Sequence, residues 1–529
     1  MCAIPVGRFL LITPAGPFIC AVAVGGDGQR QVEELEKLVD EAMQTALPVG
    51  QETPTWQAAV ESRPFRYGQF GNLALKTSEE RQKAIRDYDW NRDGRINREE
   101  MRRFLTRNRR SGDGFLTVRS NDPRAGQDAV AAPTWRLIDT DGDQILSPGE
   151  MQAAPARLHS RDERDDDLLT TGEVAPRVEP LESGRRPIAS PQTALAMLLS
   201  TDTKWDELPG IFRVAYPRGQ KSTAVGAQRA VELLQELDRN LDGYLSDEER
   251  QLFVTDEPHL QIEASFGAQD TESPDQRPLA IVPAVSADVW KSVQTDAVAA
   301  RVSLETSGLT LQWFLSPASA ATGDTEMTAQ SQLSRYDRDA NGYLDREEGS
   351  AAEQAIGPFD GLDANEDDRV FPEEFATYLT RQRTASLSQV QVLVTRAADP
   401  VFGALDADYD ERLGAREIDG AAGRLATFDA NGDGSVTSDE IPDRMMIELS
   451  RGTTTGGMMA DVPSTSPVIV PRRQGPTWFQ RMDSNGDGDV SRREFLGSHD
   501  RFVQLDNDQD GFIDAHEADR TTVPADKDE

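Results

Sequence analysis

The sequence predicts a mainly α-helical chain of tandem paired helix-loop-helix units, with short β bridges between loops and a small β-rich insert. Three observations predict this fold. A twelve-residue acidic pattern recurs along the chain, and helical stretches such as RQVEELEKLVDEAM lie beside it. Between 257 and 316 apolar residues instead alternate with a period of two, as at Leu260, Ile262 and Ala264, which indicates strands.

The acidic pattern is clearest in DSNGDGDVSRRE, residues 483–494. Asp483, Asn485 and Asp487 stand at positions 1, 3 and 5, because only every second side chain can turn inward around one point. Gly488 stands sixth, where the chain must turn sharply. Glu494, at position 12, can offer two oxygens at once. Calcium takes six to eight oxygen ligands from loops with this spacing, so the pattern predicts a calcium site.

Nine loops carry the pattern, beginning at residues 89, 139, 238, 337, 363, 406, 429, 483 and 506. Each has Asp or Asn at positions 1, 3 and 5, an apolar residue at 8 and Glu at 12. Solvated acidic loops have no need of such order, so we interpret all nine as metal sites. The predicted ligands, with position 7 acting through its backbone carbonyl, are Asp89, Asn91, Asp93, Arg95, Glu100; Asp139, Asp141, Asp143, Ile145, Glu150; Asp238, Asn240, Asp242, Tyr244, Glu249; Asp337, Asp339, Asn341, Tyr343, Glu348; Asp363, Asn365, Asp367, Arg369, Glu374; Asp406, Asp408, Asp410, Arg412, Glu417; Asp429, Asn431, Asp433, Ser435, Glu440; Asp483, Asn485, Asp487, Asp489, Glu494; and Asp506, Asp508, Asp510, Phe512, Glu517.

Some loops depart from the pattern. Gln144, Asp368 and Glu411 stand at the sixth position, where a side chain at positive φ costs on the order of 1 kcal/mol, so weaker binding is expected there. In a tenth loop, 162–173, Arg164 puts a cation at the third ligand position. We predict that this loop is a structural partner that binds no calcium.

Loop spacing predicts how the loops pair. Loop starts lie 23 residues apart in 139/162, 406/429 and 483/506, and 26 apart in 337/363, which leaves room for one short helix between neighbours. These are the expected pairs. For loop 89 a worn remnant around Asp113 is the candidate partner, and loop 238 has none.

The predicted organisation follows from these assignments. It comprises an N-terminal apolar segment (1–30), a first loop block (31–180), a helical segment with loop 238 (181–256), the β-rich insert (257–320), loop pairs at 321–380, 381–450 and 477–529, and a linker at 451–476. The N-terminal segment can be a strand pair around PAGP or a secretory signal. An extracytoplasmic location is therefore slightly favoured over a cytoplasmic one. No stretch is long enough to span a membrane.

Bulk properties narrow the function. The 529-residue chain carries a net charge of −36, which argues against a nucleic-acid partner because no broad cationic surface remains for phosphate. Nine calcium ions would halve that charge. The four histidines, at 159, 259, 499 and 516, are scattered and form no catalytic motif, so an enzyme is not expected.

These loops resemble the EF-hand superfamily, and their close pairing resembles bacterial multi-EF-hand proteins. The resemblance implies calcium coordination by the residues named above, with magnesium as a competitor. It implies no target, and a protein partner stays unidentified. We expect a non-enzymatic calcium-binding protein with a structural or buffering role. The alternative is a calcium-dependent interaction or adhesion module that uses the β-rich insert.

Overall fold

The computed structural model describes residues 3–48, 50, 52–70, 75, 77–107, 115–124, 131–175, 194–199, 207–216, 224–240, 242, 246, 248–249, 257–266, 278–283, 290–296, 300–306, 308–316, 325–452 and 475–520. The chain forms two compact units. Unit 1 contains Met1–Asn121, Thr193–Thr395 and Met445–Thr455, and unit 2 contains Asp122–Gln192, Arg396–Arg444 and Gly456–Glu529. Each unit is thus assembled from segments far apart in sequence.

A five-stranded sheet of unit 1 begins with the N-terminal apolar segment. Its strands, in the order β6-β1-β2-β7-β8, are β6 (Ala196–Leu199), β1 (Ile4–Thr13), β2 (Gly16–Gly26), β7 (Leu260–Phe266) and β8 (Leu279–Pro283). β1 and β2 form an antiparallel hairpin, and β7 lies parallel to β2. Of the two interpretations of the N-terminal segment, the structure shows the strand pair.

A six-stranded sheet completes the β structure of unit 1. Its order is β3 (Leu116–Asn121), β14 (Val390–Arg396), β17 (Asp443–Arg451), β11 (Leu309–Leu315), β10 (Arg301–Thr306) and β9 (Ser292–Asp296). β3 and β14 run parallel although more than 250 residues separate them in the chain. This pairing requires most of the chain to be present before the sheet can close.

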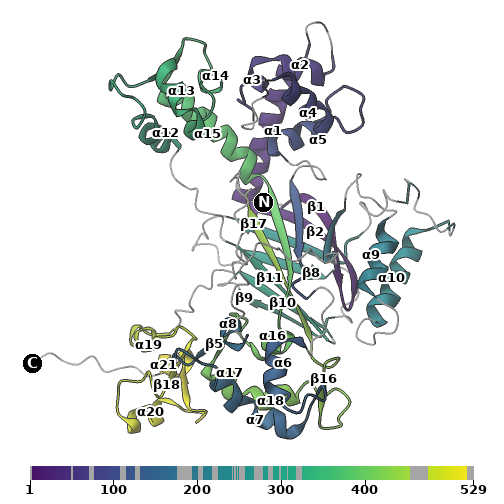
Figure 1. Cartoon of the computed structure of the whole chain (residues 1–529), viewed down its shortest axis with the longest axis vertical. Helices are drawn as coiled ribbons and strands as arrows, with labels where there is room; N and C mark the ends of the chain where they lie inside the picture. The colour runs from purple at the N-terminus through teal and green to yellow at the C-terminus, as the bar shows by residue number, and fades with distance from the viewer. Residues whose placement is uncertain are drawn as a thin grey trace, which may run out of the picture. The chain divides into compact units, whose positions relative to one another are not determined.

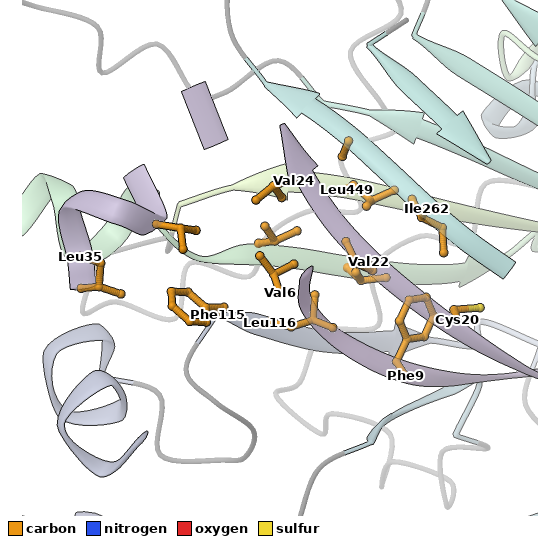
Figure 2. Packing of buried hydrophobic residues seen from close by; sticks show 14 of the residues in the cluster. Val6, Phe9, Cys20, Val22, Val24, Leu35, Phe115, Leu116, Ile262 and Leu449 are labelled. Carbon is orange, nitrogen blue, oxygen red and sulfur yellow. The ribbon is translucent and has the colours of Figure 1, made fainter. Parts of the chain in front are cut away.

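The alternation of β1 shows how the layers of unit 1 are built. Phe9 and Leu11 enter a large cluster with residues of both sheets, and the Phe9 ring lies 6.3 Å from that of Trp313. Figure 2 shows Phe9, Val22 and Ile262 from the first sheet beside Leu449 and Leu116 from the second. Leu10 and Ile12 of β1 instead pack on α9 (Leu208–Ala215) and α10 (Ala224–Leu237). The hairpin is therefore buried on both faces.

The predicted mainly α fold is wrong, because sheets of five and six strands form the centre of unit 1. Strands do occur within 257–316, as the period of two predicted, but they are no separate insert. β7 and β8 belong to one sheet and β9, β10 and β11 to the other, where they pair with strands from both ends of the chain. The alternating pattern specifies strands but not their partners.

Helix-loop-helix elements complete both units (Figure 1). Those of unit 1 are α1 (Asp27–Thr45), α2 (Trp56–Glu61), α3 (Arg63–Arg66), α4 (Ser78–Tyr88) and α5 (Arg98–Thr106), and then α12 (Thr325–Leu333), β12 (Leu344–Asp345), α13 (Arg346–Ile356), α14 (Phe359–Leu362), β13 (Arg369–Val370) and α15 (Pro372–Leu387). Tyr88 and Phe104, from α4 and α5, belong to the same hydrophobic cluster as the two sheets. α4 and α5 are therefore part of the main core of unit 1, whereas α12, α13, α14 and the first half of α15 form a separate cluster.

Unit 2 consists of short helices and two-residue or three-residue strands. They are α6 (Pro133–Ile138), β4 (Ile145–Leu146), α7 (Pro148–His159), β5 (Leu168–Thr170), α8 (Thr171–Val174), α16 (Pro400–Leu405), β15 (Arg412–Gly414), α17 (Ala415–Asp419), α18 (Ala421–Ala426), β16 (Val436–Thr437), α19 (Thr477–Met482), β18 (Asp489–Ser491), α20 (His499–Leu505), β19 (Phe512–Asp514) and α21 (Ala515–Arg520). One core contains residues from 132 to 174 and from 401 to 441, and a second contains residues 479–518. Among the residues that the structure describes, no helix is both long and apolar enough to cross a membrane.

Candidate metal centres

In the eight loops that the structure describes in full, backbone N–H groups donate hydrogen bonds to the side chains at the first and fifth positions. In loop 483, the N–H of Gly486 donates to Asp483 Oδ1 at 2.7 Å, and the N–H of Gly488 donates to Oδ2 at 3.2 Å. The N–H of position 7, Asp489, donates to Asp487 Oδ1 at 2.9 Å. The same bond to position 5 occurs at Arg95, Ile145, Tyr343, Arg369, Arg412, Ser435 and Phe512. These bonds curl the backbone so that alternate side chains face one point.

The glutamate at position 12 closes the loop and, where a helix follows directly, also lies in the first turn of that helix, whereas the chain turns instead at Glu440 and Glu494. In loop 139, Glu150 Oε1 accepts from the N–H of Thr140 at 2.7 Å, and Oε2 accepts from the N–H of Ser147 at 3.1 Å. Ser147 is the N-cap of α7 and Glu150 is its N3 residue, so the two form a capping box. Positions 9 and 12 of the pattern therefore orient the last ligand through helix capping.

Backbone angles show the sharp turn at the sixth position, while the weaker binding expected there stays a prediction. Gln144, Asp368 and Glu411 have φ of 69°, 61° and 65°, so each adopts the left-handed conformation that glycine takes at this position elsewhere. The fourth position is also left-handed, as at Arg92 (57°) and Tyr409 (66°). Sequence reasoning missed this second turn because glycine stands there in only a few of the loops.

Four loops bring three carboxylates together. In loops 139, 337, 406 and 506, an oxygen from each of positions 1, 3 and 12 lies within 4.8 Å of the others. These are the loops with Asp at both positions 1 and 3, whereas the other five have Asn at position 3. An amide oxygen is also a calcium ligand, so the difference is one of charge rather than of ligand number.

Orphaned oxygens show that a cation fits these loops. Asp89 Oδ1 and Asp506 Oδ1 are buried without a hydrogen-bond partner. A buried carboxylate oxygen without a donor is costly, and a divalent cation removes that cost. The donor set of carboxylates, an amide or carboxylate at position 3 and a backbone carbonyl suits a hard ion such as calcium.

Electrostatics differ between loops of the same pattern. Burial, together with the carboxylates of Asp406 and Asp408, raises the pKa of Glu417 to about 8. Burial also opposes ionisation of Glu150, but hydrogen bonds from Thr140 and Ser147 outweigh it and lower the pKa of that carboxyl to about 2. Loop 406 has Ala407 and Gly414 at the equivalent positions, so it lacks the two hydroxyl donors. Loop 139 therefore holds its glutamate ionised, and loop 406 holds it protonated near neutral pH.

Loop 162 contains its own cation. It keeps the loop conformation, with Asp165 and Asp167 at positive φ and the N–H of Asp167 donating to Asp162 Oδ2 at 3.0 Å. The guanidinium Nε of Arg164 lies 3.5 Å from Glu173 Oε1, the twelfth-position oxygen. This geometry explains the predicted lack of calcium binding, because an arginine already faces the closing ligand.

Two of the predicted loop pairs are wrong. Loop 406 pairs with loop 162, through Leu413 opposite Leu169, and loop 429 pairs with loop 139, through Val436 opposite Leu146. Each loop of the segment 139–173 thus pairs with a loop of the segment 406–440 instead of with its neighbour in sequence. The physical reason is a shared core, in which apolar residues of both segments form one cluster. Pairs 337/363 and 483/506 form as predicted, through β12–β13 and β18–β19.

The remnant around Asp113, which is the predicted partner of loop 89, lies outside the described residues, and among the described residues loop 89 contacts the segment at Thr55. Thr55 forms a bridge with Arg95, and the N–H of Ile96 donates to the carbonyl of Pro54 at 3.0 Å. The connection from α1 to α2 therefore takes the place of a second loop, without the acidic pattern. The one sequence sign of it is that Thr55, the N-cap of α2, follows a long helix and precedes Trp56.

Loop 238 is described only in part. The N–H of Asp242 donates to Asn240 Oδ1 at 2.8 Å, and the N–H of Ser246 donates to Glu249 Oε2 at 2.8 Å, as in the other loops. Tyr244 and the position-8 residue Leu245 lie outside the described residues, and so does most of the predicted linker 451–476.

A comparison with protein families agrees with this geometry. The model of the EF hand matches residues 82–105, 424–443, 477–496 and 499–517, which contain loops 89, 429, 483 and 506. All four have glycine at position 6. The chain therefore carries EF-hand motifs at these four places, and these motifs indicate calcium as the ion. Searches of curated proteins and of solved structures find no match.

Proposed function

We propose that this protein is a non-enzymatic calcium-binding protein with nine EF-hand sites, and that calcium acts as a structural or buffered ion. The observation that carries the proposal is the pair of buried, orphaned oxygens on Asp89 and Asp506, together with the convergence of Asp506, Asp508 and Glu517 in loop 506. Ordered carboxylates without a counter-ion repel one another, so calcium binding stabilises the folded chain.

The packing of the loops favours a structural or buffering role over a sensor. A sensor exposes an apolar groove when its helices open. Here the helices beside loop 89 share one core with both sheets, through Tyr88, Met101 and Phe104. Opening that pair would break the core of unit 1, so calcium is expected to tighten the protein rather than rearrange it.

The test is a calcium titration by calorimetry at physiological salt with magnesium present, followed on the same samples by far-UV circular dichroism. The expected result is about nine sites, with loop 162 silent, and a rise in thermal stability with little change of fold. Dissociation constants close to the surrounding free calcium concentration would favour buffering, and much lower ones would favour a structural ion. No binding in the micromolar to millimolar range would overturn the proposal.

A further inference from the structure

Among the predicted ligands that the structure describes, the first aspartate of loop 406 is the most deeply buried, and it has an arginine partner from outside the loop. Asp406 is fully buried, and Arg444 is only 5% exposed. The Arg444 guanidinium donates to Asp406 Oδ2 at 2.6 Å. A buried carboxylate needs a compensating positive charge, which Arg444 supplies from β17 when no calcium is present.

The position of the guanidinium is fixed by packing. Arg444 Cζ lies 5.0 Å from the ring centre of Tyr409, the fourth residue of the loop. A Cβ at Gly403, in α16, would lie 3.3 Å from Arg444 Cδ, so the absence of a side chain there gives the arginine its path. Arg444 is therefore packed between Tyr409 on one side and Gly403 on the other, and does not lie on the surface of the loop.

Arg444 occupies one side of the carboxylate. Oδ2 also accepts from the N–H of Glu411 at 3.0 Å, while Oδ1 accepts from the N–H of Asp410 at 3.0 Å. In loop 139 the corresponding Oδ2 of Asp139 instead accepts from the neutral indole N–H of Trp135 at 3.1 Å. In each of these two loops a side chain from outside the loop donates to the first aspartate. The donor is a charged guanidinium in loop 406 and a neutral indole in loop 139.

A second loop shows the same association of burial with arginine. Asp363, the next most buried first aspartate at 1% exposed, has Arg63 of α3 at 3.9 Å from its Oδ2 and at 3.2 Å from its carbonyl oxygen. Asp506, at 7% exposed, instead has the orphaned oxygen described above. The deepest first ligands are therefore the ones that the chain supplies with its own cation.

We propose that Arg444 is a resident counter-ion for loop 406, which keeps this loop folded without calcium and weakens its calcium affinity. The inference rests on calcium binding at loop 406, proposed above. Calcium and the guanidinium share one carboxylate, and two cations a few ångströms apart repel each other even at an effective dielectric constant of about 20. If Arg444 stabilises the calcium-free loop more than the calcium-bound loop, thermodynamic linkage requires that the difference in stabilisation free energy lowers the calcium affinity by the same amount.

The experiment uses the full chain with Arg444→Met, which keeps most of the side-chain length and removes the charge. Hydrogen exchange of peptides covering 406–414 is measured in EDTA and in saturating calcium. The expected result is exchange about tenfold faster than wild type in EDTA, with near wild-type protection in calcium, and calcium affinity at loop 406 increased about tenfold. Arg444→Lys, which restores the charge, should return both quantities most of the way.

Arg424→Met is the matched control. Arg424 Nε donates to the Ala404 carbonyl at 2.5 Å, in the same core but without a carboxylate partner. Its loss should raise exchange equally with and without calcium and leave affinity unchanged. If Arg444→Met behaves like this control, or if it weakens calcium binding, the counter-ion role is overturned. If Arg444→Met does not fold, Arg444→Gln, which keeps a donor without charge, decides between the same outcomes.

Glu417→Gln separates this inference from the proposed function. It should remove one calcium equivalent, and the affinity gain of Arg444→Met should vanish in the double variant. If Glu417→Gln leaves the stoichiometry unchanged, loop 406 is no calcium site and the proposed function fails there. Loss of protection in EDTA for Arg444→Met would still establish Arg444 as the counter-ion of Asp406 and leave only its effect on calcium overturned.

Discussion

Two groups of loops in unit 2 have the same spacing and pair differently. Loops 483 and 506 pair with each other through Val490 and Ile513, whereas loops 139 and 162, equally spaced, pair with loops 429 and 406. Every loop has an apolar residue at position 8, so this residue allows a β bridge to form but does not determine which loop is the partner. The difference teaches that loop spacing permits a pair, while the shared core selects it.

The largest effect is expected from separating the segments. Residues 475–520, which contain a complete pair with its own core, should gain helix with calcium when expressed alone. Residues 131–175 should stay unfolded with calcium until residues 396–444 are added, because each supplies only half of each bridge. Circular dichroism of each fragment and of the mixture measures this. Folding of 131–175 alone would contradict the exchanged pairing.

Truncating a bridge residue should sharpen the comparison. Leu413→Ala removes a fully buried side chain and is expected to lower the free energy of unfolding by about 3 kcal/mol. Because Leu413 lies opposite Leu169, exchange should rise at residues 168–170, far away in sequence. Val490→Ala is the matched variant, and its effect should be confined to 512–514. Urea unfolding and hydrogen exchange give both quantities, and an effect of Leu413→Ala on loop 429 alone would refute the pairing.

Loops 139 and 406 should differ in their dependence on pH. The raised pKa of Glu417, about 8, means that calcium binding at loop 406 releases a proton at pH 7 and tightens as pH rises toward 8. Without calcium the same shift stabilises the fold at low pH, and this contribution is lost as pH rises through the folded pKa. Loop 139, with Glu150 at about 2, should be insensitive above pH 4.

Calorimetry in buffers of different ionisation enthalpy measures the released protons. The expected value is close to one for loop 406, and Glu417→Gln should abolish it. Equal proton release before and after that substitution would show that another group titrates.

The smallest effect is expected at loop 162. Arg164→Asn replaces the internal cation with an amide oxygen at the third position, so one additional weak calcium equivalent should appear in the titration. Arg161→Asn, just before the loop, is the control and should add none. An unchanged stoichiometry would mean that Arg164 is not what prevents binding in this loop.

Several features of the sites could be predicted from residues alone. The alternating ligands, the glycine or strained residue at position 6 and the glutamate at 12 are local, and the hydrogen bonds of Asp483 and Glu150 follow directly from them. The arginine at 164 also identified the exceptional loop. Partners that are distant in sequence could not be predicted, because Arg444 carries no sign of loop 406 and the segment at Thr55 lacks the acidic pattern.

The fold divides in the same way. The sequence by itself determined which segments form loops, where helices begin beside them, and that residues near 260 and 310 form strands, because these depend on neighbours within about a dozen residues. Only the tertiary structure decided that those strands join two large sheets with β1, β3 and β14, and that loop 406 pairs with loop 162. Local patterns allow several partners for each strand and loop. Because burial of apolar surface is non-directional, the arrangement that forms the most favourable shared core decides which partners pair.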